Sequence, residues 1–142
     1  MRPHSPKRQQ STRTLKATRP LVGRRSDGIC DRCGFSLPIG DDGSPEFEFH
    51  HRQKRSQGGG DGPENGLALC TPCHGLTHAQ PAWSMENGWI VPRGQDPART
   101  PVMIAGQLSW LTPDGAARPV EGCPDCGRAD CGPERCAFVG AE

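Results

Sequence analysis

Two Cys-x-x-Cys pairs constrain the fold of this chain more than any other feature. Cys30 pairs with Cys33 and Cys70 with Cys73, and 36 residues separate the two pairs. Structural zinc prefers four tetrahedral nitrogen or sulfur ligands, and each Cys-x-x-Cys turn supplies two of them from a short stretch of backbone. We therefore predict one structural zinc ion that holds the two turns together. The alternatives are reduced buried cysteines and a disulfide.

The composition also favours a metal. The chain has 142 residues, with 19 Gly and 15 Pro, and only 32% of its residues are hydrophobic. This is material for one small domain with little apolar surface to bury, so the eight cysteines are expected to act as staples. No secretory signal is visible, and no apolar run approaches the roughly 20 residues that span a bilayer. We predict a cytoplasmic protein without membrane contact, in which such cysteine pairs favour zinc over disulfides.

The first 25 residues differ in charge from the rest of the chain. They hold eight Lys or Arg and no acid, whereas the remaining residues hold 9 basic and 16 acidic side chains. A segment rich in Ser, Thr, Pro and Arg is expected to be disordered, and its positive charge can follow a phosphate backbone. We predict a disordered basic arm over residues 1–25. The alternatives are a solvated tail and an Arg-rich targeting peptide.

The segment between the cysteine pairs predicts a strand, a loop and a helix. Residues 46–52, EFEFHHR, begin with alternating acidic and Phe side chains, which are typical of a half-buried strand. Residues 53–66 are too rich in Gly for regular structure and predict a flexible loop. Thr71 and Pro72 suit the N-cap and the first position of a helix that runs to about Gln80.

Four histidines flank this loop, and the four-cysteine site does not need them. His74 and His78 share one face of the predicted helix, which taken alone indicates only a solvated surface. His50 and His51 lie at the end of the predicted strand. Because adjacent strand residues point to opposite faces, the strand must bend or end there for the rings to converge. Three rings could then bind a catalytic cation while one remains free as a base.

The remainder of the chain predicts an extension and a tail. Short β-prone segments at 89–91, 102–104 and 108–111 predict a small hairpin or sheet extension, so the main domain is expected to span residues 26–112. The tail, residues 113–142, has a C-x2-C-x4-C-x4-C spacing that predicts a second zinc site, against reduced thiols in a disordered tail. Its ligands would be Cys123, Cys126, Cys131 and Cys136.

Together these motifs resemble the HNH endonucleases, in the zinc-clamped form found in tailed bacteriophages, particularly those of actinobacteria. The resemblance covers roughly residues 27–80. It rests on Cys30-x-x-Cys33, His50-His51-Arg52, the GGG loop, Asn65 ahead of Leu67-x-Leu69-Cys70, and Cys73-His74 with His78. It implies a small α+β domain stabilised by metal, with the ββα-metal (HNH) fold and a four-cysteine structural zinc.

The resemblance also implies a role for each residue of the site. His51 would be the general base that activates water, and His50 and His74 would bind the catalytic metal. His78 fits the place of a third ligand, which many HNH proteins lack. Asn65 fits the middle asparagine, which holds the loop and the base in place. The basic residues that follow are expected to contact DNA: Arg52, Lys54 and Arg55.

We therefore predict a metal-dependent endonuclease that hydrolyses phosphodiester bonds of double-stranded DNA. Its cofactors would be one or two structural Zn2+ ions and a catalytic divalent cation, either Mg2+ or Mn2+, or else Ni2+ or Zn2+. The resemblance implies action in the bacterial host cytoplasm and a role with phage terminase subunits in DNA packaging. The main alternative is a non-catalytic zinc module that binds nucleic acid, which has no need of four surplus histidines. A redox protein that uses its Cys-x-x-Cys thiols is a third interpretation.

Overall fold

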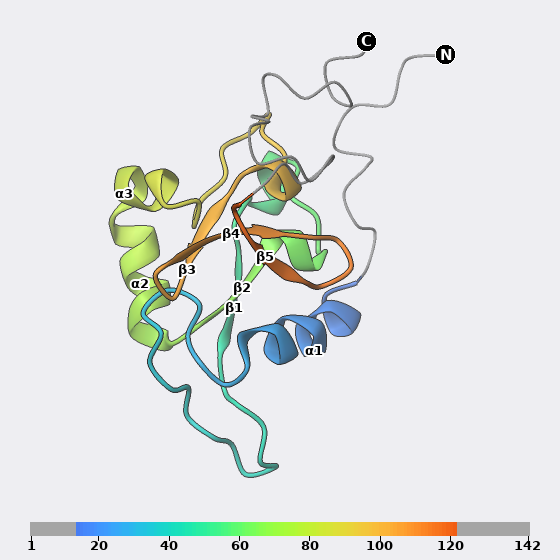
Figure 1. Cartoon of the computed structure of the whole chain (residues 1–142), viewed down its shortest axis with the longest axis vertical. Coiled ribbons are helices and arrows are strands. Elements are labelled where there is room, and N and C mark those ends of the chain that lie inside the picture. The colour runs from blue at the N-terminus through green and yellow to red at the C-terminus, as the bar shows by residue number, and fades with distance from the viewer. Residues whose placement is uncertain (1–13, 122–142) are drawn as a thin grey trace.

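A ββα unit lies at the centre of the computed structural model, which describes residues 14–121 (Figure 1). Strands β1 (Glu48–His51) and β2 (Gly66–Leu69) pair antiparallel along their whole length, and helix α2 (Thr71–Ala79) follows β2. All four residues of β2 are buried, so this strand forms the floor of the unit. The predicted small α+β domain with a strand, loop and helix order is confirmed.

Helix α2 begins one residue earlier than the sequence indicates. Its N-cap is Cys70 rather than Thr71, and Pro72 lies in the first turn. The amide of Cys70 donates a hydrogen bond to Sγ of Cys30, which holds Cys70 in an extended conformation just before the helix. Helix α3 (Pro81–Glu86) follows α2 after a break at Gln80.

Residues that belong to the predicted disordered arm form helix α1 (Leu15–Ser26). Val22 is fully buried in the core, and the side chain of Arg25 is only 4% exposed. The Arg25 guanidinium donates hydrogen bonds to two carbonyls at the end of the glycine loop and the start of β2. The prediction of disorder is therefore wrong for residues 14–25. Side chains of this segment make tertiary contacts that the composition does not reveal. Residues 1–13 lie outside the described part of the chain.

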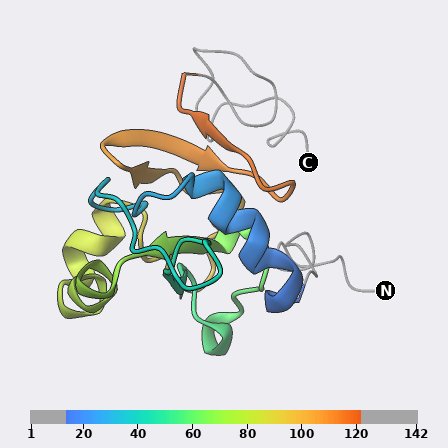
Figure 2. The same cartoon turned by 90° about the horizontal axis from the view of Figure 1, so that it is seen from below.

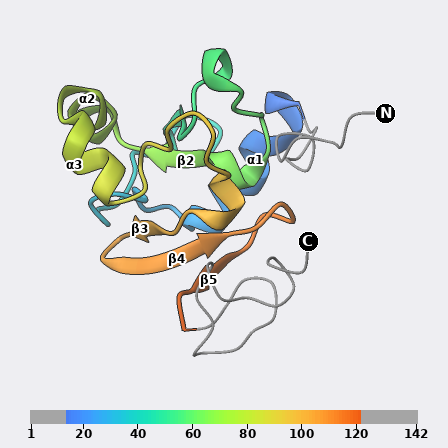
Figure 3. The same ribbon diagram turned by 90° about the horizontal axis from the view of Figure 1, so that it is seen from above.

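A second sheet contains β3 (Val102–Ile104), β4 (Gln107–Leu111) and β5 (Ala117–Pro119), paired antiparallel in that order. Figures 2 and 3 show it as a layer beside the ββα unit, with α1 at one end of the molecule and α2 and α3 at the other. The hairpin of β3 and β4 confirms the predicted extension, whereas residues 89–91 form no strand. Strand β5 lies beyond the predicted domain boundary at residue 112.

The core surrounds β2 and includes part of the cysteine site. Its buried members are Val22, Cys30, Leu37, Leu67, Ala68, Leu69, Cys73, Trp89, Val102 and Leu111. Two of the four clustered cysteines thus belong to the small core itself. No helix within residues 14–121 is long and apolar enough to cross a membrane.

The glycine loop between β1 and β2 is a folded segment rather than an irregular one. It contains two 3₁₀ turns, η2 (Arg55–Gln57) and η3 (Pro63–Asn65). Gly59 passes so close to the backbone of Gln53 that a Cβ atom at this position would lie 1.8 Å from the Gln53 carbonyl oxygen. Only glycine permits this approach, so the loop keeps the position that the site requires.

Candidate metal centres and active site

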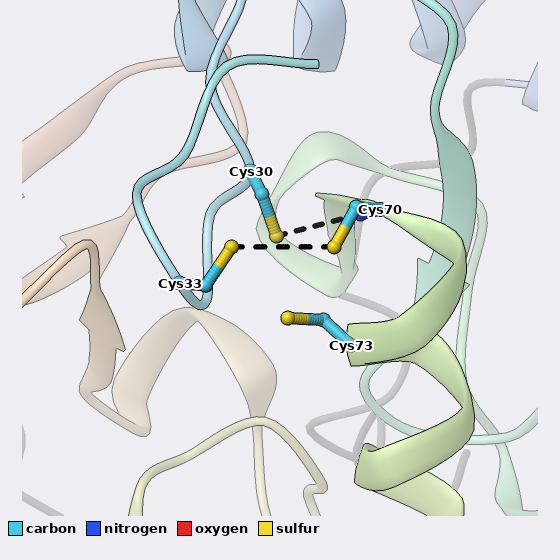
Figure 4. A group of neighbouring side chains, drawn as sticks. All are labelled: Cys30, Cys33, Cys70 and Cys73. Atoms are coloured by element: carbon cyan, nitrogen blue, oxygen red, sulfur yellow. Dashed lines mark hydrogen bonds between the residues drawn. The ribbon is translucent and has the colours of Figure 1, made fainter. Parts of the chain in front are cut away.

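Four cysteine sulfurs converge where the turn after α1 meets the start of α2 (Figure 4). Cys30 and Cys33 come from the turn, and Cys70 and Cys73 from the beginning of the helix. One ligand atom of each lies within 4.8 Å of the others, and the sulfurs of Cys33 and Cys70 are 4.0 Å apart. The predicted convergence of the two Cys-x-x-Cys pairs is confirmed.

This donor set fits a structural zinc ion. Tetrahedral bonds of about 2.3 Å would place the sulfurs roughly 3.8 Å apart, close to the separation observed. Burial raises the pKa of Cys73 well above its usual value and raises the pKa of Cys70 as well. Thiols so close together cannot all ionise without a cation, and a dication supplies the missing charge. Four sulfur donors select zinc over magnesium or calcium.

A second cluster consists of three imidazoles, which we call the histidine cluster: His50 from β1, and His74 and His78 from α2. One ring nitrogen of each lies within 4.8 Å of the others, and Nε2 of His74 is 3.2 Å from Nε2 of His78. Metal–nitrogen bonds of about 2.1 Å place neighbouring ligand nitrogens roughly 3.0–3.4 Å apart. The arrangement therefore fits three ligands of one cation.

Neighbouring oxygens determine which ring nitrogen two of these histidines offer. Nε2 of His50 donates a hydrogen bond of 2.7 Å to the carbonyl of Trp89, and Nδ1 of His74 donates one of 2.6 Å to the carboxylate of Glu48. The lone pair of His50 is then on Nδ1 and that of His74 on Nε2. Burial lowers the pKa of His50 to about 4, so this ring is neutral at pH 7 and able to bind a metal.

Glu48 and Trp89 are hydrogen-bond partners of the histidine cluster that the sequence motifs did not single out. A signal for Glu48 was present, because it lies two residues before His50 and strand alternation places both on the same face. Trp89 contributes a backbone carbonyl, which its residue type does not reveal.

His51 lies beside the histidine cluster but outside it. Its Nε2 contacts Oδ1 of Asp61 at 2.8 Å, and its side chain is 22% exposed. His51 nevertheless lines the same open pocket of about 500 Å³ as the three clustered rings. Strand β1 ends at His51, as convergence of the histidines required. A cluster, whose geometry fits a cation, and a separate imidazole thus line one pocket.

Comparison with known proteins identifies the domain that carries both centres. Residues 30–80, which include the four clustered cysteines and all four of these histidines, match the HNH endonuclease family. These residues form an HNH endonuclease domain. The type IV methyl-directed restriction enzyme EcoKMcrA of Escherichia coli strain K12 is 43% identical over 56 residues, which are 39% of this chain and 20% of that enzyme. The match thus spans about a fifth of the length of this relative.

Asn65 of the HNH domain ties the two ends of the glycine loop together. Its Oδ1 accepts a hydrogen bond of 2.7 Å from the amide of Gln53, and its Nδ2 donates to the carbonyls of Gln53 and Gly60. Asn65 is 1% exposed, so these bonds are shielded from water. The geometry agrees with the loop-holding role that the resemblance implies.

Arg52 has a structural task in the HNH domain instead of the predicted contact with DNA. Its side chain is 1% exposed, and burial lowers its pKa to about 9, which leaves it charged at neutral pH. The guanidinium donates to the carbonyls of Glu64, Gly88, Pro97 and Thr100. The prediction for Arg52 is wrong, because this cross-link between the loop and the downstream segment leaves it no access to a ligand.

The other predicted DNA contacts, Lys54 and Arg55, are exposed and line the pocket of the histidines. Their role in DNA binding stays a prediction. The predicted second zinc site, Cys123, Cys126, Cys131 and Cys136, lies outside the described residues.

Proposed function

We propose that this HNH domain is a metal-dependent endonuclease that hydrolyses phosphodiester bonds of double-stranded DNA, with His51 as its general base. The observation that carries the proposal is the position of His51 beside, but outside, the three-imidazole cluster. Hydrolysis of a phosphodiester requires both a cation and a base within reach of the same phosphate. A non-catalytic binding module needs neither.

The proposed roles of the four histidines follow from which ring nitrogen of each is free to accept. His50, His74 and His78 would hold the divalent cation, which when bound neutralises the negative charge that builds on the phosphate and on the leaving oxygen. His51 performs the proton transfer. Its Nε2–H donates a hydrogen bond to Asp61, so Nδ1 is the nitrogen that accepts a proton from water, a task that suits an imidazole near neutral pH.

The ligand atoms of the histidine cluster also indicate which cation it would bind. Three neutral imidazoles are ligands that zinc, nickel and other transition metals bind well, whereas magnesium prefers oxygen ligands. Among the cations that the sequence suggested, we therefore place Ni2+ and Zn2+ ahead of Mg2+ and Mn2+. The four-cysteine site would hold a separate structural zinc.

Two biological settings follow from different observations. A role with terminase in phage DNA packaging rests on the resemblance to phage HNH proteins alone. Methyl-directed restriction is the second candidate, because EcoKMcrA is named a methyl-directed restriction enzyme. The similarity covers 20% of that enzyme, so it supports shared cleavage chemistry more than shared target choice.

The test is cleavage of supercoiled plasmid by the full chain in Mg2+, Mn2+, Ni2+ and Zn2+. We expect nicked or linear products with the wild type, loss of cleavage in His74→Ala, and unchanged cleavage in the control Gln107→Ala on the distant strand β4. Binding of the plasmid without cleavage in all four metals would instead support the non-catalytic module.

A further inference from the structure

The carboxylate of Asp61 is the direct partner of the proposed base. Oδ1 of Asp61 lies 2.8 Å from Nε2 of His51. The same oxygen accepts two hydrogen bonds from Arg55, at 3.0 Å from Nε and 2.9 Å from Nη2. A carboxylate that touches an imidazole in this way can fix both the tautomer and the orientation of the ring.

The backbone around Asp61 is held from two sides. Its carbonyl accepts a hydrogen bond from the hydroxyl of Thr18, a fully buried residue of α1. The preceding carbonyl, of Gly60, accepts a hydrogen bond of 2.8 Å from Asn65. Hydrogen bonds from Thr18 of α1 and from Asn65 thus hold the backbone at Asp61, and they keep its carboxylate beside His51.

The charge of Asp61 suits this contact. Burial raises its pKa, but hydrogen bonds from His51 and Arg55 outweigh burial, and the net pKa lies below the usual value. Asp61 is therefore ionised at neutral pH and can only accept hydrogen bonds. The Nε2 atom that contacts this carboxylate must then carry the proton, so a base that acts through His51 uses the lone pair on Nδ1.

We propose that Asp61 is the positioning residue of this active site, which holds His51 as the Nε2–H tautomer and presents Nδ1 to water. The proposal rests on the function proposed above, in which His51 is the base. Arg55 offsets the negative charge of Asp61, so that the carboxylate does not repel the phosphate of the substrate. Asp61 itself touches neither substrate nor cation.

The first test measures kcat and KM for plasmid cleavage by the full chain carrying Asp61→Asn. Partners that orient a metal-binding histidine are worth roughly 10–100-fold in activity, and we take the same size for a partner that orients a general base. We expect a fall of that size in kcat, with KM and zinc content unchanged. Asp114→Asn, in the distant turn between β4 and β5, should match the wild type. Wild-type kcat in Asp61→Asn would overturn the proposal.

The second test does not depend on activity. The 15N chemical shifts of the His51 ring report which nitrogen carries the proton. We expect the Nε2–H tautomer in the wild type, and a mixture of tautomers in Asp61→Ala. The Nδ1–H tautomer in the wild type would overturn the proposal even if Asp61→Ala failed to fold.

The two proposals fail in different ways. Full cleavage by His51→Ala would remove His51 as the base and with it the proposed function. An inactive His51→Ala together with a fully active Asp61→Asn would leave the base in place and overturn only the positioning role.

Discussion

At the scale of single residues, burial gives His50 a different chemistry from that of an exposed histidine. Its ring is 2% exposed, and burial lowers its pKa to about 4. The ring stays neutral through the pH range in which an exposed imidazole gains a proton. It can therefore offer a lone pair to a cation without first releasing a proton.

This burial predicts a stability change with pH when the histidine cluster is free of metal. Between pH 6.5 and about 4 the unfolded chain binds a proton at His50 that the folded chain does not. The free energy of unfolding should therefore fall as the pH drops through this window, by about 3 kcal/mol in total. Denaturant titrations of the wild type and His50→Asn at several pH values measure the difference. Equal pH dependence in both proteins would contradict the assignment.

The sequence indicated which residues form the candidate site, but not which groups they contact. His74 and His78 could be predicted to share a helix face, because their spacing is a local property, whereas the choice of His50 as the third member came from the resemblance to HNH endonucleases. The contact between His50 and Trp89 could not be predicted, because it joins a ring to a backbone carbonyl far along the chain. The prediction for Arg52 failed for a related reason. An arginine beside the histidines suggests DNA contact, and only the fold shows that its guanidinium donates to four carbonyls.

At the scale of elements, the glycine loop sets the distance between β1 and the residues that support the base. Gly59 lies against the Gln53 carbonyl, and Asn65 bonds to that same carbonyl. The strand and helix were predictable because alternation and capping are encoded within a few residues. The compact path of the loop was not, because it depends on contacts between its two ends.

We expect substitutions of a loop glycine and of a helix glycine to have opposite effects on the free energy of unfolding. Gly59→Ala would place a methyl group on the Gln53 carbonyl, and such overpacking costs about 1–3 kcal/mol of stability. Gly75→Ala is the matched control: Gly75 is exposed in α2 with no neighbouring atom within 4 Å of its added Cβ. It should stabilise the helix by about 1 kcal/mol. Denaturant unfolding and plasmid cleavage measure both, and a Gly59→Ala protein as stable and active as the control would refute the loop's role.

At the scale of the whole molecule, α1 and the four-cysteine site join distant parts of one small core. Arg25 of α1 pairs with Asp31 of the cysteine turn at 3.6 Å, and both side chains are buried. Composition suggested that residues 1–25 were a disordered arm, because the number of charges in a segment does not reveal which side chains are buried.

Two truncations test the place of α1 in the fold. Deletion of residues 1–13 keeps the described contacts of α1 and serves as the reference. Deletion of residues 1–25 should lower the melting temperature sharply or prevent folding, because it removes Val22 from the core and leaves Asp31 buried without Arg25. Calorimetry of both proteins decides, and equal melting temperatures would show that α1 is dispensable.

Removal of the structural metal is expected to have the largest effect on stability. Structural zinc contributes roughly 10 kcal/mol or more to a small fold, so Cys30→Ser should unfold the domain. A zinc-free Cys30→Ser protein that melts cooperatively would mean that packing alone holds the domain together.

The central claim is that His51 supplies the base while the histidine cluster holds the cation. The most direct measurement is the single-turnover rate of plasmid cleavage by His51→Ala, made on samples whose bound metal is quantified at the same time. General base catalysis is worth about 10²–10⁴-fold. The account predicts a loss of that size with the same metal content as the wild type. Cleavage near the wild-type rate, or loss of the metal together with activity, would contradict it.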